Sequence, residues 1–377
     1  MAMDRLFVLM KEKAASDMFL NVNSPIHLKI NGSLIPINQQ KMDNVTIMAL
    51  LGEVVTPENL QILDRENELN IGIPVQNVGS FRLSAFRQRG SISAVLRFIP
   101  GHIPEINTLH LPAIVGELIM ERRGLLLVVG ATGSGKSTTI ASMLDYRNAQ
   151  RSGHILTLED PIEFLFRNKK SIVNQREIGI DSKSLEIALK NALRQAPDCI
   201  MIGEIRDQET MSAAIAYAQS GHLVIATLHA NNSYHALHRI INFFPLENRT
   251  SLSGDLASTL KAIISQRLVK TLDGHRRAAV EVMINTRHVS ELIEQNNIGQ
   301  IKEAIEKSLS PGSQTFEQAL LQLIIEGAVD QEEALSHADS ASNLFWLINN
   351  AQSGKPEKPA APPKDDSATF TEFTLSI

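Results

Sequence analysis

Residues 125–138 read LLLVVGATGSGKST. The first five, Leu125–Val129, form a short apolar run that is typical of a buried strand. Residues Gly130–Ser137 match the pattern G-x-x-x-x-G-K-[ST] in full, and a helix-like segment, Thr138–Tyr146, follows. A strand, this loop and a helix in that order are the context that a phosphate-binding P-loop requires. We therefore predict a P-loop at this point of the chain.

Each residue type in this loop suits a polyphosphate ligand. Glycines let the backbone wrap the phosphates, so that its N–H groups and the following helix N-terminus point at the anion. Lys136 would neutralise the β- and γ-phosphates, and the Ser137 hydroxyl would ligate Mg²⁺. An ordinary Gly/Ser-rich turn is the alternative, and the flanking strand and helix disfavour it. The expected cofactors are ATP and Mg²⁺, and the expected ATP-binding residues are Gly130, Ala131, Thr132, Gly133, Ser134, Gly135, Lys136, Ser137 and Thr138.

Around the P-loop, residues 113–270 alternate between short apolar strands and helical stretches. This alternation indicates an α/β domain, in which a parallel sheet carries helices on its faces. The expected strands are Leu125–Val129, Ile155–Leu158, Ile200–Ile202 and Leu223–Thr227, and the expected helices include Ser184–Ala196.

The residues before this domain follow a different pattern. Residues 1–100 open with a helix-like segment and continue with strand-like pairs, which predicts a small α+β domain. Pro100-Gly101 and Pro104 end the pattern, so residues 101–112 are the expected linker. The expected strands are Ile26–Ile30 and Leu34–Ile37, on either side of the turn dipeptide Asn31-Gly32, and then Gly79–Phe86 and Ser91–Phe98.

The C-terminal part divides into two segments. Residues 271–350 are predicted to form a helical extension around one strand, Ala278–Ile284. Residues 351–377 contain four prolines among lysines and aspartates. Such a composition cannot bury a core, so we expect a disordered tail.

Composition excludes several classes of protein. The 377 residues carry 36 Lys and Arg against 41 Asp and Glu, a net charge of −5, and 5% aromatic residues. Nucleic acid is therefore not an expected partner, because neither a positive field nor a stacking surface is indicated. The single cysteine, Cys199, excludes an internal disulfide and a zinc site of several thiolates. No apolar run approaches a membrane span or a secretory signal, which favours a cytoplasmic protein.

Acidic residues follow two of the expected strands. Glu159, Asp160 and Glu163 come after Ile155–Leu158, and Glu204 comes after Ile200–Ile202. The carboxyl ends of parallel strands meet at one edge of the sheet, so these groups should face the P-loop. One of the first three could polarise a water for attack on the γ-phosphate, although a solvated acidic loop is the alternative. Glu204 stands where a Walker B segment usually has Asp and would help to hold Mg²⁺.

Four histidines lie within 17 residues, namely His222, His229, His235 and His238. Their spacing, without a nearby cysteine or carboxylate, matches no usual metal-ligand set. A histidine at the end of Leu223–Thr227 is better suited to sensing the γ-phosphate. For His235 and His238, the surface of a helix is the favoured interpretation.

The order of these motifs resembles the secretion ATPase superfamily, whose members drive type II secretion and type IV pilus machines. The resemblance implies a PAS-like N-terminal α+β domain, a RecA-like P-loop ATPase core and a C-terminal helical extension. It is carried by Gly130–Thr138, Leu158–Glu163, Ala192–Gln195, Ile202–Asp207 and Ser220–His229, with Gln314–Phe316 and Glu326-Gly327 near the C-terminus.

The resemblance also implies roles for single residues. Glu163 would activate the attacking water, Glu204 would be the Walker B acid, and His229 would sense the γ-phosphate. The family forms hexamers in which arginines of the N-terminal domain reach the nucleotide of the neighbouring subunit. Arg82 and Arg97 match that pattern, whereas Arg87 and Arg89 do not align cleanly.

Within the superfamily, the chain is similar to the PilT/PilU family of retraction ATPases, which depolymerise type IV pili during twitching motility. The assembly ATPases generally carry a four-cysteine zinc insertion, which one cysteine excludes, so no zinc is expected. The PilT signature AIRNLIRE corresponds here to SELIEQNN at residues 290–297. This departure and the Pro-rich tail favour the accessory PilU branch.

The PilU-like interpretation implies a homohexamer at the base of the pilus machine, peripheral to the inner membrane. Its expected partners are a PilT-type retraction ATPase and the inner-membrane platform protein of the pilus. Three alternatives remain open: the main PilT-type ATPase itself, a RecA-like nucleic-acid translocase, and a scaffold that binds ATP only for ring assembly.

Overall fold

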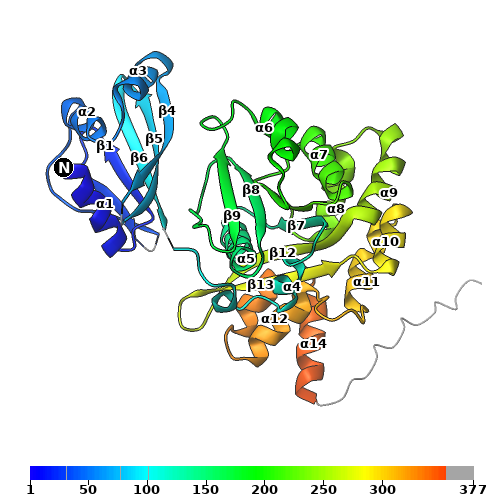
Figure 1. The fold of residues 1–377 in the computed structure, drawn as a ribbon. Helices are drawn as coiled ribbons and strands as arrows, with labels where there is room; N and C mark the ends of the chain where they lie inside the picture. Colours follow the sequence, from blue (N-terminus) through cyan, green and yellow to red (C-terminus); the bar gives the residue numbers. More distant parts are fainter. Residues whose placement is uncertain (31, 77, 101, 354–377) are drawn as a thin grey trace, which may run out of the picture.

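The computed structural model describes residues 1–30, 32–76, 78–100 and 102–353. An N-terminal α+β domain and a larger α/β domain follow one another, joined by an irregular segment at residues 102–105 (Figure 1). The predicted turn at Asn31-Gly32 and the predicted break at Pro100-Gly101 lie partly outside the described residues. The predicted tail lies outside them from residue 354 onward.

The described residues of the N-terminal domain form an antiparallel sheet of order β3-β2-β1-β6-β5-β4 with three helices. Every second side chain of β5 is buried, including Phe81 and Leu83, and Phe7 of α1 stacks on Phe81 with ring centroids 4.1 Å apart. The face that carries Arg82 is therefore turned away from this core. The strands are β1 (Asp17–Asn21), β2 (His27–Ile30), β3 (Ser33–Pro36), β4 (Glu68–Val75), β5 (Gly79–Gln88) and β6 (Ser91–Pro100). The helices are α1 (Ala2–Glu12), α2 (Asn44–Gly52) and α3 (Pro57–Glu66).

The predicted opening helix and all four predicted strands of this domain are confirmed. Strands β1 and β4 and helices α2 and α3 were not predicted. Gly72 and Pro74 obscure β4 in the sequence, because both residues normally weaken a strand. The structure places β4 at the edge of the sheet, where proline is tolerated.

The α/β domain is built on a seven-stranded sheet of order β13-β12-β7-β11-β10-β8-β9, parallel except for the β12–β13 pair. The P-loop strand β7 lies between β12 and β11. The four predicted strands are confirmed as β7, β8, β10 and β11, while β9 and β12 were not predicted. The strands are β7 (Gly124–Val129), β8 (Gly153–Glu159), β9 (Ser171–Glu177), β10 (Cys199–Ile202), β11 (Leu223–Leu228), β12 (Leu260–Lys270) and β13 (Arg276–Ile284).

Helices cover both faces of this sheet, which explains why its inner strands β7, β10 and β11 are buried along their length and almost entirely apolar. Leu125 and Leu127 of β7 belong to the core beneath α6–α11, whereas Leu126 and Val128 belong to the core beneath α4 and α5. The helices are α4 (Ile114–Leu118), α5 (Lys136–Gln150), α6 (Leu185–Ala192), α7 (Gln208–Gln219), α8 (Ser233–Asn242), α9 (Arg249–Thr259), α10 (Arg287–Glu294), α11 (Ile301–Glu306), α12 (Phe316–Ile325), α13 (Gln331–His337) and α14 (Ala341–Ser353). Short 3₁₀ turns in the described part of the chain are Ile106–Leu109, Leu193–Gln195, Leu246–Asn248 and Ile298–Gln300.

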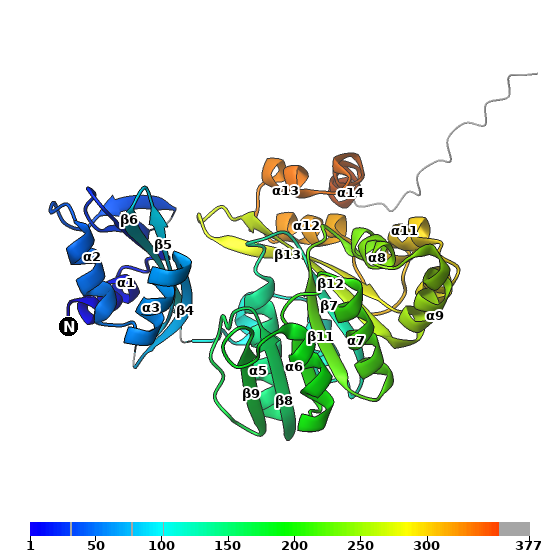
Figure 2. The ribbon, with the colours of Figure 1, turned by 90° about the horizontal axis from the view of Figure 1, so that it is seen from above.

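The C-terminal helices pack on the far end of the same sheet. The predicted strand Ala278–Ile284 is part of β13, which pairs with β12 along its length. The expected boundary at residue 270 falls at the end of β12, within this hairpin, so the sheet continues across it. Val269 and Ala279 of the hairpin pack with Phe316 of α12, and Figure 2 shows α12 beside β13. The last helix, α14, extends to Ser353, three residues beyond the expected end of the extension.

Candidate active site

The predicted P-loop lies between the end of β7 and the start of α5. Gly135 adopts a φ of +90°, and a Cβ at this position would lie 2.7 Å from Nε2 of Gln266 on β12. A larger residue would therefore need both a strained backbone and a displaced side chain. Gln266 also accepts a hydrogen bond from the Thr139 hydroxyl at 2.7 Å, so β12 supports the first turn of α5.

Lys136, the first residue of α5, is buried and points back over the loop. Its Nζ donates to the carbonyl oxygens of Gly130 and Ala131, at 2.9 Å each. Burial lowers the pKa of the Lys136 ammonium, while the charges of Glu204 and Glu163 act in the opposite direction. The Lys136 ammonium therefore contacts the P-loop backbone and interacts electrostatically with the carboxylates of Glu204 and Glu163.

A cavity of about 390 Å³ opens at the carboxyl ends of β7, β8, β10 and β11. It brings together four of the nine predicted P-loop residues, the histidine at the end of β11, and Glu159, Asp160 and Glu163, which we call the acidic box. Besides Gly133, the lining includes the polar residues Thr132, Lys136, Ser137, Glu159, Asp160, Glu163, Glu204, Arg206, Asp207, Thr210, Thr227 and His229. Its place in an open parallel sheet is where ligands of α/β proteins bind.

Burial separates the carboxylates of the acidic box. Glu159 is buried and accepts hydrogen bonds from the Thr157 hydroxyl at 2.7 Å, from Gln175 Nε2 at 3.1 Å and from the Glu163 backbone N–H at 3.4 Å. Burial raises the pKa of Glu159. The side chain of Glu163 is exposed to the cavity. Glu159 thus shapes the loop, and Glu163 is free to meet a ligand.

Glu204 connects the ends of β10 and β11. One carboxylate oxygen lies 3.3 Å from Nε2 of His229, and the other accepts a hydrogen bond from Nε of Arg206 at 2.7 Å. The Thr227 hydroxyl also links the two strand ends, because it donates a hydrogen bond to the Gly203 carbonyl oxygen at 2.5 Å. Arg206 is not among the predicted site residues, although it lies in the motif Ile202–Asp207. A charged residue in a loop has no local signal that separates a site residue from a surface one.

The other predicted histidines lie away from this cavity. His222 precedes β11, at the opposite end of the strand from His229, and its Nδ1 lies 3.0 Å from the Ser220 hydroxyl. Six strand residues separate the two histidines by roughly 20 Å. His235 is exposed on α8, as expected. His229 is therefore the only one of the four that lines the cavity.

Arg82 and Arg97 lie opposite each other on β5 and β6. Nε of Arg97 donates to a carboxylate oxygen of Asp17 at 2.8 Å, within the N-terminal domain. Arg82 is half-buried. Burial lowers the pKa of its guanidinium, and the negative charge of Glu163 acts in the opposite direction. Arg82 is thus within electrostatic range of Glu163 in its own chain, and its action on a neighbouring subunit stays a prediction.

A second cavity, of about 320 Å³, borders the P-loop on the β12 side. Ala131 and Ser134 of the loop line it together with Leu268 and Arg276. The loop therefore separates two hollows, one at the acidic groups and the other at the β12–β13 hairpin.

A P-loop on an inner strand of a mainly parallel sheet, with acidic residues after β8 and β10 lining the same cavity as its lysine, defines a RecA-like P-loop ATPase. The chain belongs to the family described as Type II/IV secretion system protein, whose model matches residues 3–336.

Characterised relatives narrow this placement. The chain is 44% identical to the type IV pilus ATPase PilU of Pseudomonas aeruginosa, over 92% of this chain and 91% of the relative. It is 36% identical to the type IV pilus retraction ATPase PilT of the same organism, over 91% of this chain and 100% of the relative. A crystal structure of the pilus retraction motor PilT with bound ADP superposes with a TM-score of 0.83 at 39% identity, covering 90% of this chain and 99% of that one.

These similarities confirm the predicted family and fold class. They also agree with the preference for the PilU branch, since the identity to PilU exceeds that to PilT. As an ATPase of this family, the protein binds nucleotide. None of the helices among the described residues has both the length and the apolar character that crossing a bilayer requires.

Proposed function

We propose that the protein is a hexameric ATPase that powers the retraction of type IV pili, in the accessory role of the PilU branch. The observation that carries the proposal is the cavity in which Lys136, Glu163, Glu204 and His229 meet. The similarity to PilU over nine tenths of both chains supports the pilus as the site of action. The main PilT-type role is the alternative within the same family.

The two cavities suggest how ATP lies on the P-loop. The γ-phosphate would occupy the cavity lined by Lys136 and the acidic residues, which we call the phosphate cavity. There Lys136 supplies positive charge and the acidic residues can act on water. The nucleoside would lie on the β12 side, where Leu268 offers an apolar contact and Arg276 a cation. The loop backbone would then hold the phosphates between them.

Ser137 and Glu204 are the residues that would hold Mg²⁺. Both line the phosphate cavity and offer oxygen atoms, which Mg²⁺ prefers. Among the described residues, no three His, Cys, Asp or Glu side chains converge as metal ligands, so phosphate and water would complete the shell. A bound Mg²⁺ would neutralise charge on the phosphates.

The side chains of this chain divide the chemistry of hydrolysis. Glu163 accepts a proton from the attacking water as the water oxygen bonds to the γ-phosphorus and the bond to ADP breaks. Lys136 stabilises the charge on the β- and γ-phosphates. His229, held beside Glu204, contacts the γ-phosphate, so that the position of the residues after β11 depends on whether this phosphate is bound.

In the proposed ring, Arg82 and Arg97 of one subunit supply positive charge to the nucleotide of its neighbour, as an arginine finger does. Movement of the N-terminal domain against the next core would then act on the platform protein from the cytoplasmic side of the inner membrane. A PilT-type ATPase is the proposed partner, because the departure from the PilT signature at residues 290–297 favours an accessory role.

Retraction force in living cells tests this function. Deletion of the gene should lower the force on retracting pili in a strain with an active PilT-type ATPase, and a plasmid copy carrying Glu163→Gln should fail to restore it. Unchanged force would contradict the retraction role. Full retraction without an active PilT-type ATPase would instead support the main PilT-type role.

A further inference from the structure

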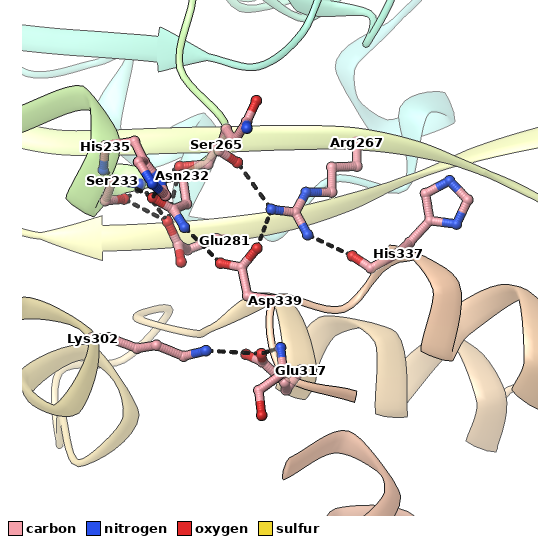
Figure 3. Close-up of polar contacts among 12 residues, drawn as sticks. Asn232, Ser233, His235, Ser265, Arg267, Glu281, Lys302, Glu317, His337 and Asp339 are labelled. Atoms are coloured by element: carbon pink, nitrogen blue, oxygen red, sulfur yellow. Dashed lines mark hydrogen bonds and ion pairs between the residues drawn. The ribbon is translucent and has the colours of Figure 1, made fainter. Parts of the chain in front are cut away.

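A polar network outside the phosphate cavity holds the segment that follows His229 (Figure 3). We call residues 231–233 the post-sensor segment. Arg267 donates from Nη2 to the carbonyl oxygen of Asn231 at 3.1 Å, and the Asn232 side chain donates from Nδ2 to Asp339 Oδ2 at 2.6 Å. Glu281 accepts hydrogen bonds from the backbone N–H of Ser233 at 2.8 Å and from its hydroxyl at 2.7 Å. Each residue of the segment is thus fixed by a different side chain.

Asp339 and Arg267 also bind each other. Oδ1 of Asp339 pairs with Nη2 of Arg267, and the two side chains are only 17% and 19% exposed. Arg267 is oriented further by donating to the His337 carbonyl at 2.5 Å and by lying 3.9 Å over the Phe316 ring. Removing Asp339 would therefore leave a largely buried cation without its counter-charge, which is costly.

The opposite side of Asp339 is anchored on the C-terminal helices. The next residue, Ser340, donates its backbone N–H to Oε1 of Glu317 on α12 at 2.8 Å. The same oxygen accepts from Nζ of Lys302 on α11 at 2.9 Å, and Glu317 is fully buried. The loop between α13 and α14 is consequently a fixed support for the post-sensor segment.

Two residues that the network holds, Asn232 and Arg267, are close in sequence to residues of the candidate active site. Only two residues separate His229 from Asn232, which also caps α8 by accepting the backbone N–H of His235 at 2.9 Å. Arg267 follows Gln266, the residue that holds Thr139 of the P-loop helix. The network therefore joins β12, the strand that supports the P-loop, to the post-sensor segment that follows His229.

We propose that Asp339 is a positioning residue for ATP hydrolysis. It fixes Asn232 against Arg267 on β12 and thereby sets the distance of His229 from Glu204 and the γ-phosphate. The inference rests on the proposed role of His229 and adds a residue of the C-terminal extension to the reaction. Because Asp339 acts through His229, its loss should slow turnover more than it weakens ATP binding.

The test uses the purified full-length protein with two changes at this position, Asp339→Ala and Asp339→Asn. The matched control is Glu326→Gln, which removes a different ion pair between the sheet and the C-terminal helices, Arg277 Nη1 to Glu326 Oε2 at 2.7 Å. We expect Asp339→Ala to lower kcat about tenfold with KM for ATP changed less than about twofold. The control should keep both values near wild type. If Asp339→Ala does not fold, the same changes in kcat and KM are expected of Asp339→Asn, and that variant then tests the inference.

A second measurement shows whether the effect passes through His229. In a His229→Ala background, the Asp339 change should cause little further loss of kcat. Wild-type kcat in the Asp339 variants, an equal loss in Glu326→Gln, or a full additional loss in the His229→Ala background would overturn the inference. A wild-type rate in His229→Ala alone would instead reject the proposed role of His229, and this inference with it.

Discussion

His229 Nε2 lies 3.3 Å from Glu204 Oε1, a contact that joins the residues following β11 and β10 at the phosphate cavity. Burial and the charge of Lys136 lower the pKa of His229 from its ordinary value of 6.5, although Glu204 acts in the opposite direction. At neutral pH the imidazole is therefore uncharged. An uncharged imidazole has one N–H donor, so it can donate either to Glu204 or to a phosphate without adding a cation beside Lys136.

The lowered pKa of His229 predicts the direction of a pH effect. The unfolded chain binds this proton before the folded chain does, so acidification below pH 6.5 should lower the free energy of unfolding until the folded histidine is also protonated. Turnover should fall over the same acidic range. We expect His229→Gln to lose this part of the pH dependence in both the melting temperature and kcat. Identical profiles for the variant and the wild type would assign the effect to another group.

Lys136 should be indispensable, because its buried ammonium is the cation that the P-loop directs at the phosphates. We expect Lys136→Ala to lower ATP turnover by at least about a hundredfold, measured as phosphate release. Binding of a fluorescent ATP analogue should weaken in parallel. Lys183→Ala, which removes an exposed lysine, is the control and should behave as wild type. Near-normal turnover in Lys136→Ala would exclude the P-loop as the nucleotide site.

Sequence reasoning located the parts of this site that depend on local order. The P-loop is contiguous, and Glu204 and His229 could be placed beside it because the carboxyl ends of parallel strands share one edge. The supporting contacts could not be derived in that way, since they join residues far apart in the chain. Thr139 and Gln266 are 127 positions apart, and Asn232 and Asp339 are 107 apart. Such pairs become visible only when β12 and the C-terminal helices are placed in space.

Glu163 and Glu159 differ in burial, and this difference predicts different roles. Glu163→Gln should keep ATP binding and lower hydrolysis about a hundredfold or more, because an amide cannot take the proton of the attacking water. Binding is measured with the fluorescent analogue and hydrolysis by phosphate release. Loss of binding would show that Glu163 has a structural role instead. The hydrogen bonds of Glu159 make that residue the structural member of the pair.

Arg82 allows a direct test of the ring, because the charge of Glu163 in its own chain acts on it while its proposed target is the neighbouring subunit. Arg82→Ala and Glu163→Gln should each be nearly inactive as pure hexamers, with the ring size checked by mass photometry in the presence of nucleotide. If Arg82 acts across the interface, an equal mixture should regain activity, since about a quarter of the sites in a random ring combine an intact core with an intact neighbouring arginine. If Arg82 acts within its own chain, every site of the mixture keeps one defect and no activity returns. Subunit exchange between the two variants, followed by the ATPase rate, therefore decides whether the N-terminal domain completes the site of the next subunit or its own.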